Sequence, residues 1–258
     1  MAAQDTPDED RKYRAPALEK GLDVLELLAA HGAPMTASQM SAELDRSVSE
    51  LFRMIQVLEF RGYIEQSPEG YRLTNRLFTL GMSQAPVKTL VETALPLMRE
   101  LSAKTVQSCH LVLPTDTQIV VVARIESPGD LGYAVRLGYR RNMIDATSGR
   151  LFYAMASPAA RKLLKASLTA QHGAARFKRF ERDADAIAQQ RYIARDSDFV
   201  KGVVDLAAPI MGADGVLGAL ITPFIERIPP TCDTKQALAE LTRAAAALSK
   251  QMGATTQA

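Results

Sequence analysis

Apolar residues recur at helical spacing in three segments of the first third of the chain. The third segment, residues 47–61, is expected to bury one apolar stripe, made of Val48, Leu51, Phe52, Ile55 and Leu58. Ser47 and Glu50 form an S-x-x-E capping box, which marks the start of this helix. A second capping box at Thr36 opens the preceding short helix. This spacing predicts short helices joined by a tight turn, with the polar side of the last one exposed.

The first helix is expected to run from Pro16 to the His31-Gly32-Ala33-Pro34 segment, whose glycine and proline stop it. Its apolar face is predicted to comprise Leu18, Leu22, Leu25 and Leu28. Acidic residues occupy the opposite side, so this helix is amphipathic.

Two β-prone runs follow the third helix. Tyr63-Ile64-Glu65 and Tyr71-Arg72-Leu73 flank Ser67-Pro68-Glu69-Gly70, and this composition is typical of a hairpin. Three helices and a hairpin make a winged helix-turn-helix, expected over residues 15–76. Such domains place the first turns of the third helix in the major groove of DNA. Alone, segment 47–61 is more ordinarily interpreted as an amphipathic surface helix; its neighbours favour DNA recognition.

The rest of the chain predicts a second domain. A linker helix is expected at 77–86, where Leu77, Phe78 and Leu80 would suit a dimer contact, and a longer helix at 87–103, which Pro96 should kink or interrupt. Strands and helices then mix, which indicates a sheet flanked by helices over 87–254. The expected strands are 108–113, 118–125, 133–137, 202–209 and 216–222, and the expected helices are 148–156, 159–166, 180–191 and 237–252. The fold class is therefore α+β.

Composition narrows the class of protein. The 258 residues suffice for two domains, and 47% hydrophobic content allows a core in each. No apolar run approaches the ~20 residues of a membrane helix. Residues 1–14 are charged and are expected to form a disordered arm; they lack the apolar segment of a signal peptide. Cys109 and Cys232 make no disulfide framework, so we expect a reduced, cytoplasmic setting. Because no apolar run is long enough to span a membrane, we also expect no membrane contact.

Charge is a point against DNA binding, because DNA-binding domains are usually basic. The net charge is only +2, and residues 1–81 hold 9 basic side chains against 13 acidic ones. The acid lies largely in the N-terminal arm and the first helix. The arginines gather around the candidate recognition helix and the wing, at Arg46, Arg53, Arg61, Arg72 and Arg76.

Over nearly its whole length the chain resembles the IclR family of bacterial transcriptional regulators. The N-terminal likeness lies in PALEKGLDVLELLA, VSELFRMIQVLEFRGYI and EGYRL. The C-terminal likeness lies in DATSGRLFYA and KGVVDLAAPIMGADGVLGALI. The resemblance implies a winged helix, a linker helix and a GAF-like α/β effector-binding domain. It also implies a homodimer or dimer of dimers on double-stranded promoter DNA, and a small carboxylate or aromatic acid as effector.

The resemblance, together with the exposed side of the third helix, also implies site residues. The DNA-binding set is Arg46, Ser47, Ser49, Glu50, Arg53 and Gln56. The effector-binding set is Leu111, Ile144, Ala146, Thr147, Ser148, Gly149, Asp205, Leu220 and Thr222. Glu50 is interpreted first as a capping residue, because a carboxylate near phosphates repels them. Leu220 and Ile144 replace polar residues of the family, which indicates a less polar pocket.

One aspartate and a group of three arginines in the second domain leave alternatives open. Asp205 stands where the family often has cysteine, and beside a ligand carboxylate it must be neutral or face elsewhere. Arg136, Arg140 and Arg141 could pair with a ligand carboxylate, but a solvated edge is the more ordinary interpretation.

Catalytic chemistry finds no support in the sequence. His31, His110 and His172 are far apart, no Cys/His spacing suggests a metal, and no nucleophile elbow or phosphate-binding glycine loop occurs. Cys109 and His110, adjacent on a strand, point to opposite faces. We therefore expect no cofactor and no catalytic residue. The favoured function is a ligand-responsive regulator of a catabolic operon, and the alternative is an α/β-domain enzyme whose winged helix makes protein contacts.

Overall fold

The computed structural model describes residues 15–82, 85–198, 200–213 and 215–253. The chain forms two compact units that divide between Ala85 and Pro86, inside the segment 77–86 expected as a linker. The arm expected at 1–14 lies outside the described residues. Each unit is considered by itself.

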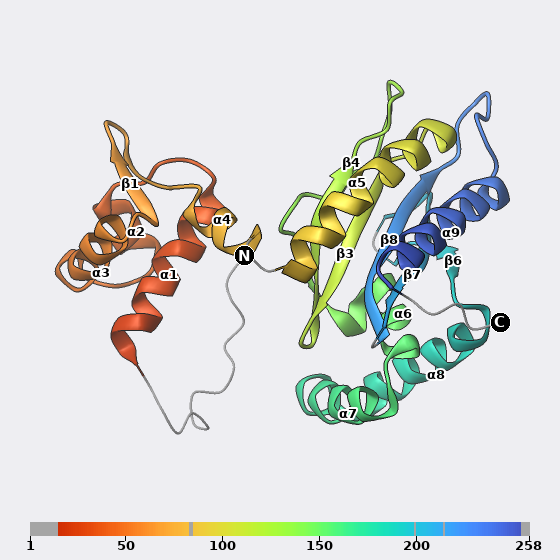
Figure 1. Cartoon of the computed structure of the whole chain (residues 1–258). Coiled ribbons are helices and arrows are strands. Elements are labelled where there is room, and N and C mark those ends of the chain that lie inside the picture. The colour runs from red at the N-terminus through yellow and green to blue at the C-terminus, as the bar shows by residue number, and fades with distance from the viewer. Residues whose placement is uncertain (1–14, 83–84, 199, 214, 254–258) are drawn as a thin grey trace. The chain divides into compact units, whose positions relative to one another are not determined.

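The first unit is a winged helix-turn-helix (Figure 1). Its elements are α1 (Pro16–His31), α2 (Ala37–Glu43), α3 (Val48–Phe60), β1 (Ile64–Ser67), β2 (Gly70–Leu73) and α4 (Arg76–Met82). Both predicted capping boxes are present, at Thr36 and at Ser47. The predicted hairpin pairs β1 with β2 in antiparallel register. The core of this unit comprises Val24, Leu25, Leu28, Met35, Met40, Leu51, Ile55 and Ile64.

The apolar faces predicted for the first and third helices were too wide. In α1 the buried residues are Gly21, Val24, Leu25 and Leu28, whereas Leu18 and Leu22 are exposed. In α3 only Leu51 and Ile55 are fully buried, and Val48 and Phe52 are largely exposed. The reason is size: the small core covers only the centre of each stripe.

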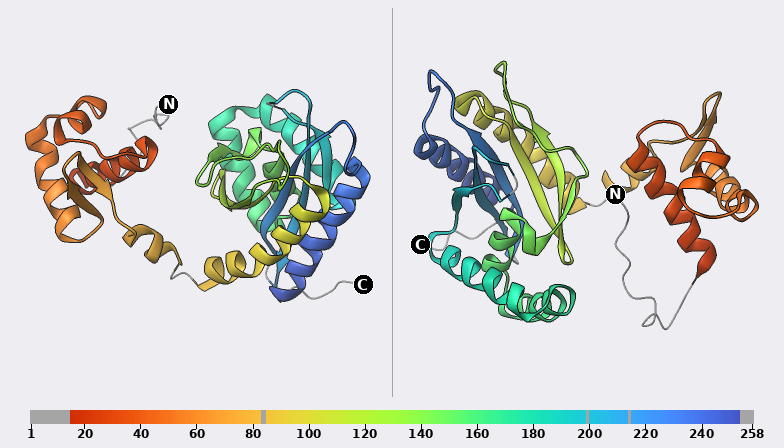
Figure 2. Two further views of the ribbon diagram at one scale, coloured as in Figure 1. Left: turned by 90° about the horizontal axis from the view of Figure 1, so that it is seen from above. Right: turned by 180° about the vertical axis from the view of Figure 1, so that it is seen from behind.

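The second unit is an antiparallel sheet with helices on both faces (Figures 1 and 2). Its strands, in the spatial order β5-β4-β3-β8-β7-β6, are β3 (Cys109–Thr115), β4 (Gln118–Ile125), β5 (Arg140–Asn142), β6 (Ile193–Asp196), β7 (Val203–Gly212) and β8 (Gly215–Ile225). Its helical elements are α5 (Ala85–Thr105), η1 (Met143–Asp145), α6 (Thr147–Met155), α7 (Pro158–His172), α8 (Ala174–Gln190) and α9 (Thr234–Gln251).

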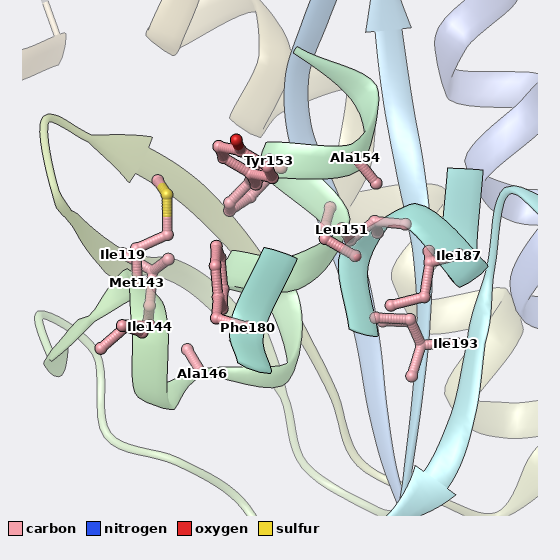
Figure 3. Close-up of a cluster of buried hydrophobic side chains, with 14 of the residues drawn as sticks. Ile119, Met143, Ile144, Ala146, Leu151, Tyr153, Ala154, Phe180, Ile187 and Ile193 are labelled. Atoms are coloured by element: carbon pink, nitrogen blue, oxygen red, sulfur yellow. The ribbon is translucent and has the colours of Figure 1, made fainter. Parts of the chain in front are cut away.

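Two apolar layers lie on opposite faces of this sheet. Helices α5 and α9 lie side by side on one face, and α6 with α8 covers the other (Figure 2). The α6 layer includes Ile144, Ala146, Leu151 and Phe180, whose side chains gather around α6 (Figure 3). The two layers are separated only by the sheet, so each strand residue belongs to one layer or the other.

Several predicted elements differ from those observed. Residues 133–137 were expected to form a strand but do not; the amide of Val135 donates to Nε2 of His110 over 2.8 Å instead of to a neighbouring strand. No strand was predicted at β6, which is only four residues long. Helices α7 and α8 extend further than predicted. Pro96 does not interrupt α5, which continues to Thr105. Among the described residues, no helix combines the length and apolar character needed to cross a bilayer.

Candidate DNA-binding surface and effector site

The start of α3 is fixed by a reciprocal pair of contacts. Glu50 donates its backbone N–H to Ser47 Oγ over 3.3 Å, and Ser47 donates its own N–H to Glu50 Oε2 over 3.2 Å. Lys20 of α1 pairs with Glu50 Oε1 over 2.8 Å. The hydrogen bond from Lys20, followed by those from Ser47, lowers the pKa of Glu50 to about 2. The capping interpretation of Glu50 is confirmed, and its negative charge faces a lysine of its own domain.

The remaining predicted DNA-binding residues present their side chains to solvent. Ser49, Arg53 and Gln56 are exposed along α3. Arg46 is only half-buried and pairs with Asp23 of α1 over 3.3 Å. Of these side chains, Arg53 is the cation that makes no hydrogen bond or ion pair with any described residue. It is therefore available to a partner outside the chain.

In the second unit, the first turn of α6 is joined to the sheet by a buried contact. The Thr147 hydroxyl donates to Asp205 Oδ2 of β7 over 2.7 Å. Burial raises the pKa of Asp205, and the hydroxyls of Thr147 and then Ser197 act against this shift. Tyr133 lies close enough for the charge of Asp205 to add to the effect of burial, which raises the tyrosine pKa. The result is a carboxyl group held in a largely apolar layer by hydroxyl groups.

Gly149 has a structural role in this turn. A Cβ built at Gly149 would lie 1.9 Å from the carbonyl oxygen of Met143, so no side chain fits there. Gly149 belongs to the predicted effector-binding set, but the backbone of η1 already occupies the space beside its Cα. Ser148 and Ala146, its neighbours, are buried on the α6 face. Substitution at Gly149 thus tests folding rather than ligand binding.

The structure does not bring the whole predicted effector set together. Leu111 and Leu220 belong to the layer under α5 and α9, whereas Ile144 and Ala146 belong to the α6 layer. Thr222 is paired with Leu206, which also faces α5 and α9. The expectation that Leu111, Leu220 and Thr222 wall the same pocket as the α6 turn was therefore wrong.

The β8 residues assigned to the α6 face of the sheet were wrong by one position along the strand. Asp205 is directly opposite Pro223, and Ala207 is directly opposite Ile221. Directly opposed residues of antiparallel strands share a face of the sheet. Pro223 and Ile221, rather than the even-numbered residues beside them, therefore face α6. Side chains alternate between the two faces along β8. The large apolar residues Leu220 and Phe224 share one face, and this alternation is the signal that could have corrected the assignment.

An ion-pair network lies next to this site, and no sequence pattern predicted it. Arg150 of α6 is almost buried, and its guanidinium contacts Asp183 of α8 over 3.4 Å and Asp198 over 3.0 Å. Arg195 of β6 contacts the same two carboxylates, over 3.6 and 2.9 Å. Asp183 and Asp198 are distant from Arg150 in sequence, so no local pattern predicts the network.

An open cavity of about 460 Å³ lies beside this network. It is lined by Asp196, Ser197, Asp198, Val200, Lys201, Gly202 and Val203. Ser197 lies close enough to Asp205 to influence the pKa of that carboxyl, but its buried hydroxyl has no hydrogen-bond partner among the described residues. The cavity is therefore an opening at the sheet edge next to the α6 turn.

The cysteine and histidine of β3 do not form a catalytic pair. Cys109 faces the α5 layer, and burial raises the pKa of its thiol to about 12. His110 accepts a hydrogen bond from Val135, and burial lowers its pKa to about 4. No cluster of potential metal ligands occurs in the part of the chain that the structure describes. Cys109 is a buried free cysteine.

Comparison with known proteins decides the family. The model of the IclR helix-turn-helix domain matches residues 17–68, and that of the bacterial transcriptional regulator IclR C-terminal domain matches residues 83–250. The chain belongs to the IclR family. It is accordingly a DNA-binding transcriptional regulator and not an enzyme, which rules out the alternative considered from sequence.

Curated relatives and solved structures of IclR-family regulators agree with this placement. The HTH-type transcriptional regulator KdgR of Dickeya chrysanthemi is 29% identical over 224 residues, which are 84% of this chain and 73% of KdgR. The glycerol operon regulatory protein of Streptomyces griseus is 24% identical over 92% of this chain and 96% of its own. An IclR homolog from Microbacterium hydrocarbonoxydans, complexed with 4-hydroxybenzoate, is 18% identical, with a TM-score of 0.76 over 92% of this chain and 98% of its own. The last likeness concerns the fold.

Proposed function

We propose that this IclR-family regulator controls a catabolic operon in response to a small, partly apolar organic or aromatic acid. The observation that carries the proposal is the buried contact between Thr147 and Asp205, which joins the first turn of α6 to the sheet beside an open cavity. A carboxyl group in an apolar layer is a polar anchor of the kind that orients a small ligand. The fold-level likeness to a 4-hydroxybenzoate complex supports an aromatic acid.

The proposed effector site lies between α6 and the sheet. Thr147 and Ser148 come from the start of α6, and Asp205 comes from β7. Apolar walls come from Ile144 on one side and Ile221 on the other. A ligand carboxylate beside an ionised Asp205 would be repelled. Burial raises the pKa of Asp205, which lowers the cost of protonating this carboxyl group when an acid binds.

The proposed DNA contacts are made by α3 in the major groove. Ser49, Arg53 and Gln56 would reach base edges or phosphates, because they are exposed in the first three turns. We further propose a homodimer or a dimer of dimers. The apolar side chains of α4 support this, since Phe78 is 69% exposed and Leu80 is 48% exposed within one chain.

Thermal denaturation with a panel of acids that includes 4-hydroxybenzoate tests the effector site. A ligand that binds only the folded protein raises the midpoint by mass action. The acid that gives the largest shift should lose its effect in Asp205→Ala. The matched control is Asp130→Ala, which removes an exposed carboxylate that does not line the cavity. If both variants keep the wild-type shift, the ligand lies elsewhere; if no acid gives a shift, the acid class is wrong.

Light scattering tests the assembly. At concentrations that saturate DNA, the wild-type protein should have at least twice the mass of one chain. A single-chain mass under those conditions contradicts the dimer.

A further inference from the structure

The recognition helix α3 carries exposed apolar side chains next to its exposed polar ones. Phe52 is 48% exposed and Val48 is 40% exposed, and neither belongs to the apolar core of this domain as far as it is described. By contrast, Leu51, the neighbour of Phe52, is fully buried. The apolar stripe of α3 is therefore wider than the part of it that the domain covers.

The exposed apolar and polar residues form adjacent columns. Val48, Phe52 and Gln56 succeed one another at one-turn intervals, and Ser49 and Arg53 form the next column around the helix. Phe52 and Arg53 therefore belong to neighbouring columns of the exposed surface in the first two turns. These are the turns that enter the major groove in helix-turn-helix proteins.

Two backbone donors at the N-terminal end of α3 are already occupied. The N–H groups of Ser47 and Glu50 both bond within the capping box, and Lys20 neutralises the Glu50 carboxylate. The capping box therefore leaves fewer backbone N–H groups to bind a phosphate at this end, and the exposed side chains gain importance for recognition.

The major groove presents one apolar group to such side chains, the 5-methyl group of thymine. A phosphate offers nothing to an aromatic ring, and the other base edges in this groove are polar. We infer that Phe52, assisted by Val48, contacts thymine methyl groups and specifies thymine beside the base or phosphate that Arg53 contacts. This rests on the proposed placement of α3 in the major groove.

Replacement of thymine by deoxyuridine tests this inference, because it removes the methyl group alone. The probe is a duplex selected from a random library by the wild-type protein, with its thymines replaced one at a time. At one or more thymines in each half-site, replacement should weaken wild-type binding about fourfold, which corresponds to ~0.8 kcal/mol for one buried methyl-sized group. Phe52→Ala should bind the thymine and deoxyuridine duplexes equally at those positions, whereas Phe52→Leu should keep part of the discrimination.

Phe60→Ala is the matched control, because Phe60 is the last residue of α3 and is 89% exposed. It should discriminate thymine from deoxyuridine as the wild type does. Equal wild-type affinity for both bases at every position overturns the inference, and so does unchanged discrimination in Phe52→Ala. A change of oligomeric mass in Phe52→Ala with unchanged discrimination would assign Phe52 to a protein contact and also overturn it.

Arg53→Ala distinguishes a wrong placement of α3 in the groove from a wrong assignment of the methyl contact. If Arg53→Ala binds the selected duplex as tightly as the wild type, α3 is not in the groove and the inference falls with that placement. If Arg53→Ala weakens binding while thymine discrimination is independent of Phe52, the placement stands and only the methyl contact is wrong.

Discussion

Thr147 and Asp205 are 58 residues apart in sequence, yet the threonine hydroxyl donates a 2.7 Å hydrogen bond to the aspartate inside the second domain. Thr147→Val would keep the shape of the side chain and leave Oδ2 without this donor. A buried acceptor that loses its partner costs about 1–3 kcal/mol. We expect urea denaturation at pH 7 to show a loss of this size, and Thr147→Ser, which keeps the hydroxyl, to lose less.

The same pair predicts how the loss depends on pH. Since burial raises the pKa of Asp205, the folded state holds its proton more tightly than the unfolded state does. Asp205 therefore stabilises the fold least once the pH has risen above its folded-state pKa, where its charge is buried. The effect of Thr147→Val should be larger at pH 7 than at pH 4. Equal losses at both values would show that the ionisation state of Asp205 in the folded protein does not change between them.

Replacement of Thr222 by valine should have the opposite effect on stability to that of Thr147→Val. Its hydroxyl is fully buried and finds no partner among the described residues. Thr222→Val replaces this hydroxyl with a methyl group of similar size and should stabilise the fold by about 1 kcal/mol. Because Thr222 faces α5 and α9, the thermal shift produced by an acid effector should stay as in the wild type. A lost shift would return Thr222 to the effector site.

His110 should make the protein sensitive to mild acid. Its folded-state pKa is about 4, below the ordinary value of 6.5, chiefly because burial disfavours the charged ring. Between these two values the unfolded state binds a proton that the folded state does not, so stability is full above pH 6.5 and falls toward pH 4. The loss should approach about 3 kcal/mol. His110→Gln should give a flatter profile in denaturation series across this range, and a profile as steep as the wild type's would assign the acid sensitivity to other groups.

Arg53→Ala should weaken DNA binding without affecting the fold. Its side chain makes no contact that stabilises the domain among the described residues, so the thermal midpoint should not change. Loss of a bidentate base contact would cost about 1–3 kcal/mol of binding free energy. Arg179→Ala, in an exposed position on α8, removes the same charge and should bind DNA as the wild type does when both are titrated at equal salt concentration. Equal affinities for the two variants would contradict the groove assignment.

Much of the first domain could be predicted because its signals are local. The capping boxes at Thr36 and Ser47, and the turn before Gly70, each depend on residues close in sequence. The second domain depends on pairings between distant strands, and there the errors were of register. Whether Leu220 or Ile221 faces α6 is decided by the pairing of β8 with β7, which no local pattern reveals. The Arg150 network was missed for the same reason, since its acidic partners lie on α8 and in the loop after β6.

The alternation along β8 sorts its residues by function in a way that a genetic screen would detect. From 219 to 224 the odd-numbered residues face α6 and the even-numbered ones face α5 and α9. Substitutions at Ile221 and Pro223 should therefore yield regulators that accumulate normally but respond to the wrong inducer or to none. Substitutions at Leu220 and Phe224 should instead lower the amount of protein in the cell, and the induction ratio of what remains should be unchanged.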